Sequence, residues 1–121
     1  KKNIFYNDDV LSTEKLHSLI KYCTASICLY KEVNDNFKFV GKSSGKLMRS
    51  IALGKPVISN KNISFEFVEE FNFGKLINLS DEIADAVNFI IDNYDKLKEN
   101  CEKNYFKISF ESYWETFEKK L

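Results

Sequence analysis

Short apolar runs alternate along this chain with segments whose apolar residues recur at helical spacing. Four of these runs have the length of strands and are bounded by turn-forming residues: Ile4–Tyr6, Ile27–Tyr30, Lys55–Ile58 and Leu76–Ile77. The second run has no polar alternation, which is typical of a strand covered on both faces. Strands that alternate with helices predict right-handed βαβ connections and a parallel sheet. We therefore predict an α/β fold.

Six segments have helical spacing, and their apolar stripes run through Leu16–Cys23, Leu47–Ala52, Phe65–Phe71, Ile83–Ile91, Leu97–Tyr105 and Phe110–Leu121. Ser12 or Thr13 is expected to cap the first helix and Ser80 the fourth, because a hydroxyl oxygen accepts a free N–H of the first turn. Gly54 and Gly74 are expected to end the second and third. The architecture predicted is a Rossmann-like parallel sheet flanked by helices, with extra C-terminal helices.

The 121 residues, 44% of them hydrophobic, suffice for one domain with its own core, so residues 1–121 are predicted to form a single domain. The chain begins on a predicted strand and without Met, so we expect that a preceding βα unit of a longer chain is missing. The 18 Lys and Arg residues balance the 18 Asp and Glu residues. This balance excludes the strongly basic surface of a typical nucleic-acid-binding domain.

Neither a membrane span nor a secretion signal is visible in the sequence. No apolar run approaches the roughly 20 residues that cross a bilayer, and no basic segment precedes an apolar one. Cys23, Cys28 and Cys101 form no C-x-x-C pair, and with the single His17 they do not make a metal-ligand cluster. We predict reduced thiols, His17 without a catalytic role, and a cytoplasmic protein.

The stretch Ser43-Ser44-Gly45-Lys46 is the one predicted helix start with anion-binding character. Gly45 lets a ligand approach the backbone, and a helix start presents unpaired N–H donors and a partial positive charge. The two hydroxyls and the Lys46 ammonium would complete a diphosphate site; the alternative interpretation is a simple N-cap. The spacing of Gly41, Gly45 and Lys46 does not fit a Walker A loop, and no G-x-G-x-x-G fingerprint occurs.

The longer run 43–58, SSGKLMRSIALGKPVI, resembles the donor-binding segment of GT-B glycosyltransferases, the family that includes capsule and lipopolysaccharide sugar transferases. In that family a helix led by lysine or serine runs into a strand that begins Gly-Lys-Pro-Val-Ile or similar. Residues 12–30 resemble the family's preceding helix and strand. Glu66–Val68, Gly74–Ile77 and Asp81–Ile91 resemble its C-terminal part, so the resemblance covers nearly the whole chain in the right order.

The resemblance implies that this chain is the C-terminal, nucleotide-binding half of a GT-B fold, with an acceptor domain before it. It assigns Ser43, Ser44, Gly45 and Lys46 to the diphosphate of a nucleotide sugar and places Tyr6 and Asn7 near the nucleobase. It also implies that Glu66 faces the donor; the alternative is a carboxylate that only stabilises its helix start. No metal or other cofactor is expected, and any association with the inner face of a membrane would come through the missing part.

The sequence departs from the family at one important pair of positions. Many relatives carry E-x7-E, with the second glutamate commonly bound to ribose, but here the pair falls on Gly41 and Arg49. Arg49 is the only arginine of the chain. It either pairs with a phosphate or an acidic sugar, or it lies on the solvent face of its helix.

We expect the donor-binding domain of a bacterial glycosyltransferase that acts in cell-surface polysaccharide or glycolipid synthesis. Because this stretch has no acceptor domain and no evident general base, we expect it to bind the donor without turnover. Two alternatives stay open: a non-catalytic α/β interaction module that docks through the aromatic face around Trp114, and a nucleotide-sugar epimerase of the same architecture. The sequence names neither the base nor the sugar.

Overall fold

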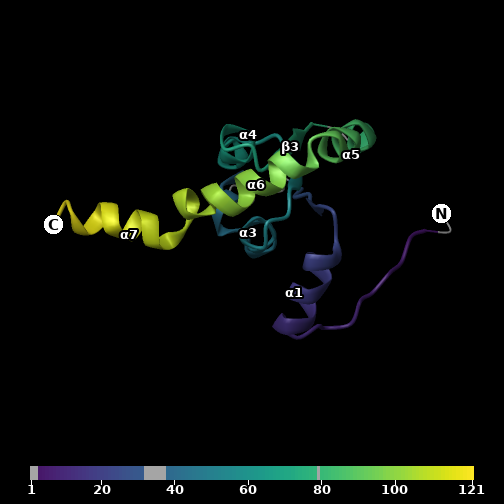
Figure 1. Ribbon diagram of the computed structural model, residues 1–121, viewed down its shortest axis with the longest axis horizontal. Coiled ribbons are helices and arrows are strands. Elements are labelled where there is room, and N and C mark those ends of the chain that lie inside the picture. Colours follow the sequence, from purple (N-terminus) through teal and green to yellow (C-terminus); the bar gives the residue numbers. More distant parts are fainter. Residues whose placement is uncertain (1–2, 32–37, 79) are drawn as a thin grey trace.

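The computed structural model describes residues 3–31, 38–78 and 80–121 and has a mixed α/β fold (Figure 1). Its described residues form a parallel sheet of three strands in the order β1-β2-β3. The strands are β1 (Ser26–Cys28), β2 (Val57–Asn60) and β3 (Gly74–Ile77). In register, Ile27 lies opposite Ile58, and Ile58 lies opposite Lys75. The predicted parallel sheet flanked by helices is confirmed.

The prediction of the first of the four strands is wrong. Residues Ile4–Tyr6 form no strand, and Phe5 is 92% exposed. Their apolar pattern is that of a strand, but a strand also needs a neighbour to accept its backbone hydrogen bonds, and no described strand lies beside this segment.

The helices follow the predicted order along the chain. They are α1 (Thr13–Tyr22), α3 (Gly45–Ala52), α4 (Phe67–Glu70), α5 (Ile83–Asp92), α6 (Tyr94–Asn104) and α7 (Phe110–Glu118). Short 3-10 turns lie between them: η1 (Gly41–Ser43), η2 (Ile63–Phe65), η3 (Ser80–Glu82) and η4 (Tyr105–Ile108). The polar stretch before α3 contains a short apolar island at residues 37, 39 and 40, of which Phe37 lies outside the described residues.

Two of the predicted helix boundaries are confirmed and two are wrong. Ser12 caps α1 by accepting the N–H of Lys15, and Gly54 follows α3 with a φ of 74°. Ser80 instead opens η3, so that α5 begins three residues later, after Glu82. Gly74 does not end α4 but begins β3. A Cβ there would lie 1.8 Å from the carbonyl oxygen of Val57, so Gly74 permits close approach of two strands.

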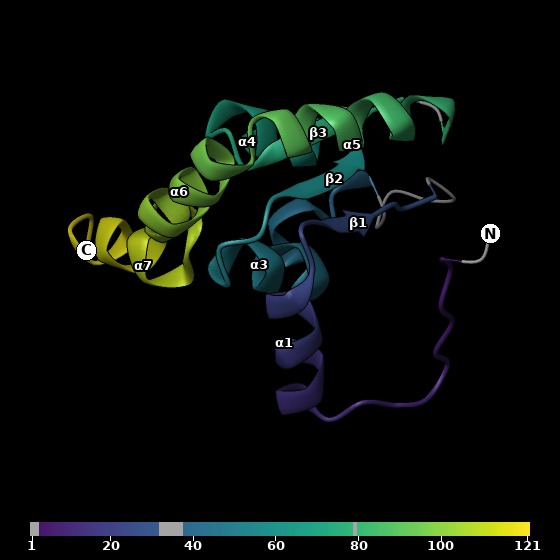
Figure 2. The ribbon, with the colours of Figure 1, turned by 45° about the vertical axis from the view of Figure 1, so that its right-hand side comes forward.

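The core has two parts, one on each face of the sheet, because successive residues of a strand point to opposite faces. On β2, Val57 packs into a cluster with Leu47 and Ile51 of α3, whereas Ile58 packs with Ile90 of α5. Figure 2 shows α3 and α5 on opposite sides of the sheet. Both faces of the central strand are therefore covered.

The two ends of the chain lie away from this core. Figure 1 shows the N-terminal segment and α1 projecting from the sheet at one side and α7 at the other. Neither α1 nor α7 has a buried residue. On α1, Leu16 and Ile20 are half-buried and Leu19 is 52% exposed, whereas on α7 Phe110 is 73% exposed.

No helix of the described residues is both long and apolar enough to pass through a lipid bilayer.

Candidate functional site

The start of α3 lies at the carboxyl edge of the sheet. The chain leaves β1 at Cys28, returns antiparallel to the strands as α3, and enters β2 at Val57. In open parallel sheets this edge is where ligands bind, since helix N-termini point outward there. Tyr30, two residues after β1, reaches this helix start with its hydroxyl, and its N–H donates to Asn60 Oδ1 at the end of β2.

Ser44 is the N-cap of α3, and its hydroxyl is already engaged by protein groups. Its Oγ accepts the N–H of Leu47 at 3.3 Å and hydrogen-bonds to the hydroxyl of Tyr30. The residue is only 3% exposed. Among the four residues predicted to hold a diphosphate, Ser44 therefore positions the helix start, while its three neighbours are exposed.

The loop before α3 is held by η2. The N–H of Gly41 donates to Ser64 Oγ at 3.1 Å, and Ser64 in turn hydrogen-bonds to Asn62 Oδ1. A Cβ at Gly41 would lie 2.0 Å from the carbonyl oxygen of Ser64, so only glycine permits this approach. These contacts position η1 immediately before the helix.

Two backbone amides at the start of α3 donate to no acceptor among the described residues. The N–H groups of Ser43 and Ser44 donate to Val40 and Gly41 carbonyls at 2.7 and 3.1 Å. Within the described parts of the chain, the amides of Gly45 and Lys46 have no protein acceptor. The space above Gly45 is also clear, because no atom lies within 4 Å of where its Cβ would be. Two free N–H donors at a helix start are suited to phosphoryl oxygens.

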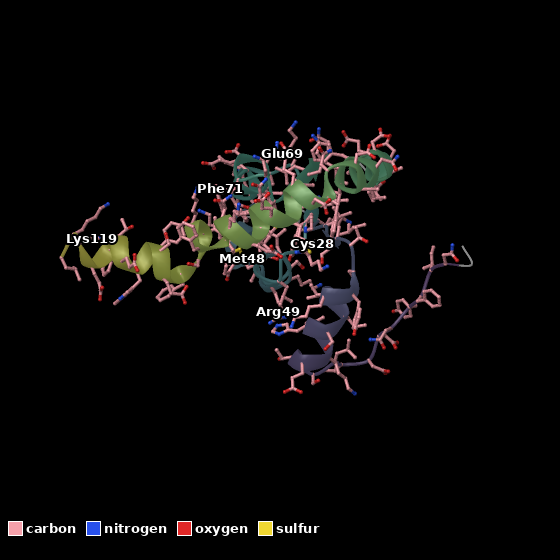
Figure 3. All side chains as sticks on the ribbon, viewed as in Figure 1. Cys28, Met48, Arg49, Glu69, Phe71 and Lys119 are labelled. Atoms are coloured by element: carbon pink, nitrogen blue, oxygen red, sulfur yellow. The ribbon has the colours of Figure 1, made fainter. Side chains whose placement is uncertain are left out.

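Lys46 and Arg49 occupy the side of α3 that faces α1. Both line a hollow of about 260 Å³ between α1, β1 and α3, which we call the α1–α3 hollow; Ser26 and Cys28 also line it. Burial raises the pKa of the Cys28 thiol, and the nearby Lys46 ammonium partly offsets that rise. Figure 3 shows Arg49 in the space between α3 and α1. Arg49 therefore does not lie wholly on the solvent face of its helix, since its side chain is half-buried beside α1.

The other predicted donor contacts lie elsewhere. Glu66 is exposed and lines a separate hollow of about 390 Å³ together with Lys61 and Glu69. Tyr6 is 88% exposed, and Asn7 lies along α1, where it lines a hollow with Glu14. The structure brings neither of these N-terminal residues to the start of α3.

Sequence reasoning missed Tyr30 and Lys42. The ring of Tyr30 stacks on Phe65 at 5.7 Å between centroids while its hydroxyl reaches Ser44. The ammonium of Lys42 donates to the Tyr113 hydroxyl and lies 4.7 Å from the centre of that ring, so α7 starts close to η1. The position of Tyr30 at the end of a predicted strand was a usable signal, whereas no sequence pattern indicated the contact of Lys42 with Tyr113, 71 residues away.

The described residues include no group of three or more His, Cys, Asp or Glu side chains that could hold a metal ion. The class of protein that the fold defines is thus a mixed α/β protein with an open parallel sheet and two exposed amides at its carboxyl edge. Comparison of the chain with family models, curated proteins and solved structures found no match.

Proposed function

We propose that this chain is the donor-nucleotide-binding domain of a GT-B-type glycosyltransferase and that the start of α3 binds the diphosphate of a nucleotide sugar. The observation that carries the proposal is the pair of amides at Gly45 and Lys46, which have no acceptor among the described residues and lie at the carboxyl edge of a parallel sheet. The resemblance of residues 43–58 to the family's donor-binding segment supplies the substrate class. The exposed Ser43 hydroxyl and the Lys46 ammonium add further donors.

The chemistry that follows is stabilisation of a leaving group. When the glycosidic bond to the nucleotide breaks, negative charge develops on the diphosphate. Fixed N–H dipoles at a helix start stabilise this charge without reorganisation, as donors of an oxyanion site do. We propose that transfer itself, in polysaccharide or glycolipid synthesis, requires an acceptor domain outside this chain and proceeds without a metal ion.

Gly45→Asp tests the proposal, because it places a negative charge at the phosphate position without disturbing the fold. The new side chain enters open space, and an acidic residue in the first turn stabilises a helix. We expect the wild-type chain to bind UDP or GDP in calorimetry and the variant to bind at least about tenfold more weakly, a difference of about 1.4 kcal/mol.

Gly45→Asn is the matched control, since it has the same size without the charge. It should retain most of the affinity. Failure of the folded wild-type chain to bind any nucleoside diphosphate or nucleotide sugar would contradict the proposal.

A second function has one observation in its favour. The aromatic face of α7 is exposed, and along it the ring of Trp114 stacks on Phe110 and lies tilted against Phe117. Exposed apolar patches of this kind mark interaction surfaces, so a non-catalytic module that docks through α7 is the alternative. A folded chain that binds a partner protein but no nucleotide would favour that function.

A further inference from the structure

The α1–α3 hollow has an unusual balance of charge. Lys46 and Arg49 both line it, one helical turn apart on the same face of α3. No carboxylate occurs among the described residues that line it. Nor does either cation take part in any of the ion pairs found between described residues. Among its described lining residues, the hollow thus has two positive charges and no compensating negative one.

The hydroxyls of the hollow do not neutralise these cations. Ser50 Oγ hydrogen-bonds to Ser26 Oγ at 2.7 Å and to the carbonyl oxygen of Lys46 at 2.9 Å. These groups are therefore engaged with each other and with the backbone of α3. Lys46 and Arg49 are thus the charged donors that the described lining offers a bound molecule.

The walls of the hollow strengthen any interaction made there. Leu16 and Ile20 of α1 form one side, and residues of β1 form the floor. Arg49 is half-buried between them. Apolar walls lower the local dielectric constant, so an anion beside Arg49 is attracted more strongly than at an open surface. A guanidinium also binds carboxylate and phosphate oxygens in a bidentate manner.

Lys46 connects the hollow to the start of α3, because its amide belongs to the proposed diphosphate site and its side chain lines the hollow. We infer that the hollow receives a further anionic group of the bound nucleotide, so that the natural ligand carries a negative charge beyond its diphosphate. This inference rests on the proposed function. The additional group is a carboxylate on the sugar or a phosphate on the ribose, and both would be recognised by the same pair of cations.

The test compares acidic ligands with their neutral counterparts by calorimetry. One pair is UDP-glucuronate and UDP-glucose, and the other is the 3′,5′-bisphosphate and the 5′-monophosphate of uridine, each repeated in the guanosine series. One acidic ligand is expected to bind about tenfold more tightly than its counterpart, and which pair shows the difference identifies the source of the charge.

Arg49→Gln should remove this preference and leave the affinity for UDP or GDP nearly unchanged. Lys75→Gln is the matched control: Lys75 lies on β3, pairs with Glu69 and is not among the residues that line the hollow. The Lys75→Gln variant should keep the wild-type preference for the acidic ligand. Raising the salt concentration should reduce the preference of the wild-type chain for the acidic ligand, because salt screens charge–charge attraction. This measurement requires no variant.

Equal binding of acidic and neutral ligands by a wild-type chain that still binds the nucleoside diphosphate would overturn the inference alone. A preference that survives in a folded Arg49→Gln variant would also overturn it. If the folded chain binds no nucleotide at all, the proposed function and the inference fall together.

Discussion

The hydroxyl of Ser44 hydrogen-bonds both to the backbone of its own helix and to Tyr30 at the end of β1. A serine followed by glycine and lysine at a helix start is compatible with ligand binding and with capping. Whether such a serine binds a ligand or caps its helix depends on whether its side chain is turned toward solvent or toward the protein. For Ser44 it is turned inward, and the open donors are the amides of the next two residues.

Cys101 gives a prediction for the dependence of stability on pH. Burial raises the pKa of its thiol from 9.0 to about 12. Because the folded-state pKa lies above that of the unfolded chain, ionisation favours unfolding. This contribution to stability is complete below pH 9 and is lost as the pH rises from 9 toward 12.

Between pH 8.5 and 10.5 we expect Cys101 to lower the free energy of unfolding by on the order of 2 kcal/mol. Urea denaturation of the wild-type chain and of Cys101→Ala at both pH values measures it. The variant should be less stable near neutrality but should lose less stability at high pH. Equal losses in the two proteins would refute this account.

At the scale of elements, α3 has both of its ends defined by local sequence. Ser44 caps its N-terminus, and the left-handed Gly54 follows its C-terminus before the chain enters β2. Capping and glycine preferences act over a few residues, so the sequence predicts these boundaries well. Gly74 misled the prediction because its role, close contact with Val57, arises between strands that are distant in sequence.

Gly54→Ala should destabilise the protein by about 1–2 kcal/mol, because an L-residue is strained at positive φ. Its Cβ would also lie 2.9 Å from Glu102 Oε1, which would have to move. Gly45→Ala is the comparison: its Cβ enters open space, and we expect no loss of stability. Thermal or urea unfolding of both variants measures the difference, and equal effects would argue against a conformational role for Gly54.

At the scale of the whole molecule, stability is unevenly distributed. The central strand β2 is covered on both faces, whereas α1 and α7 project from the sheet without a buried residue (Figure 1). An isolated helix of about ten residues is only marginally stable in water. We therefore expect α1 and α7 to unfold locally at a lower free-energy cost than the sheet.

Native-state amide hydrogen exchange should show this gradient directly. We expect amides of Ile58 and Ser59 on β2 to exchange only through global unfolding, and those of α1 and α7 to exchange with opening free energies below about 2 kcal/mol. The core strand serves as the internal reference. Protection of α1 equal to that of β2 would mean that this helix packs against something in solution.

The sequence by itself determined the order of the helices, the helix starts at Ser12 and Ser44 and the parallel α/β class, because these depend on periodicity and on capping within a few residues. Only the tertiary structure decided that Ile4–Tyr6 has no neighbouring strand, that Ser44 is turned inward and that Arg49 lies beside α1. Each of these depends on which distant residue is adjacent, and a local pattern contains no information about that neighbour.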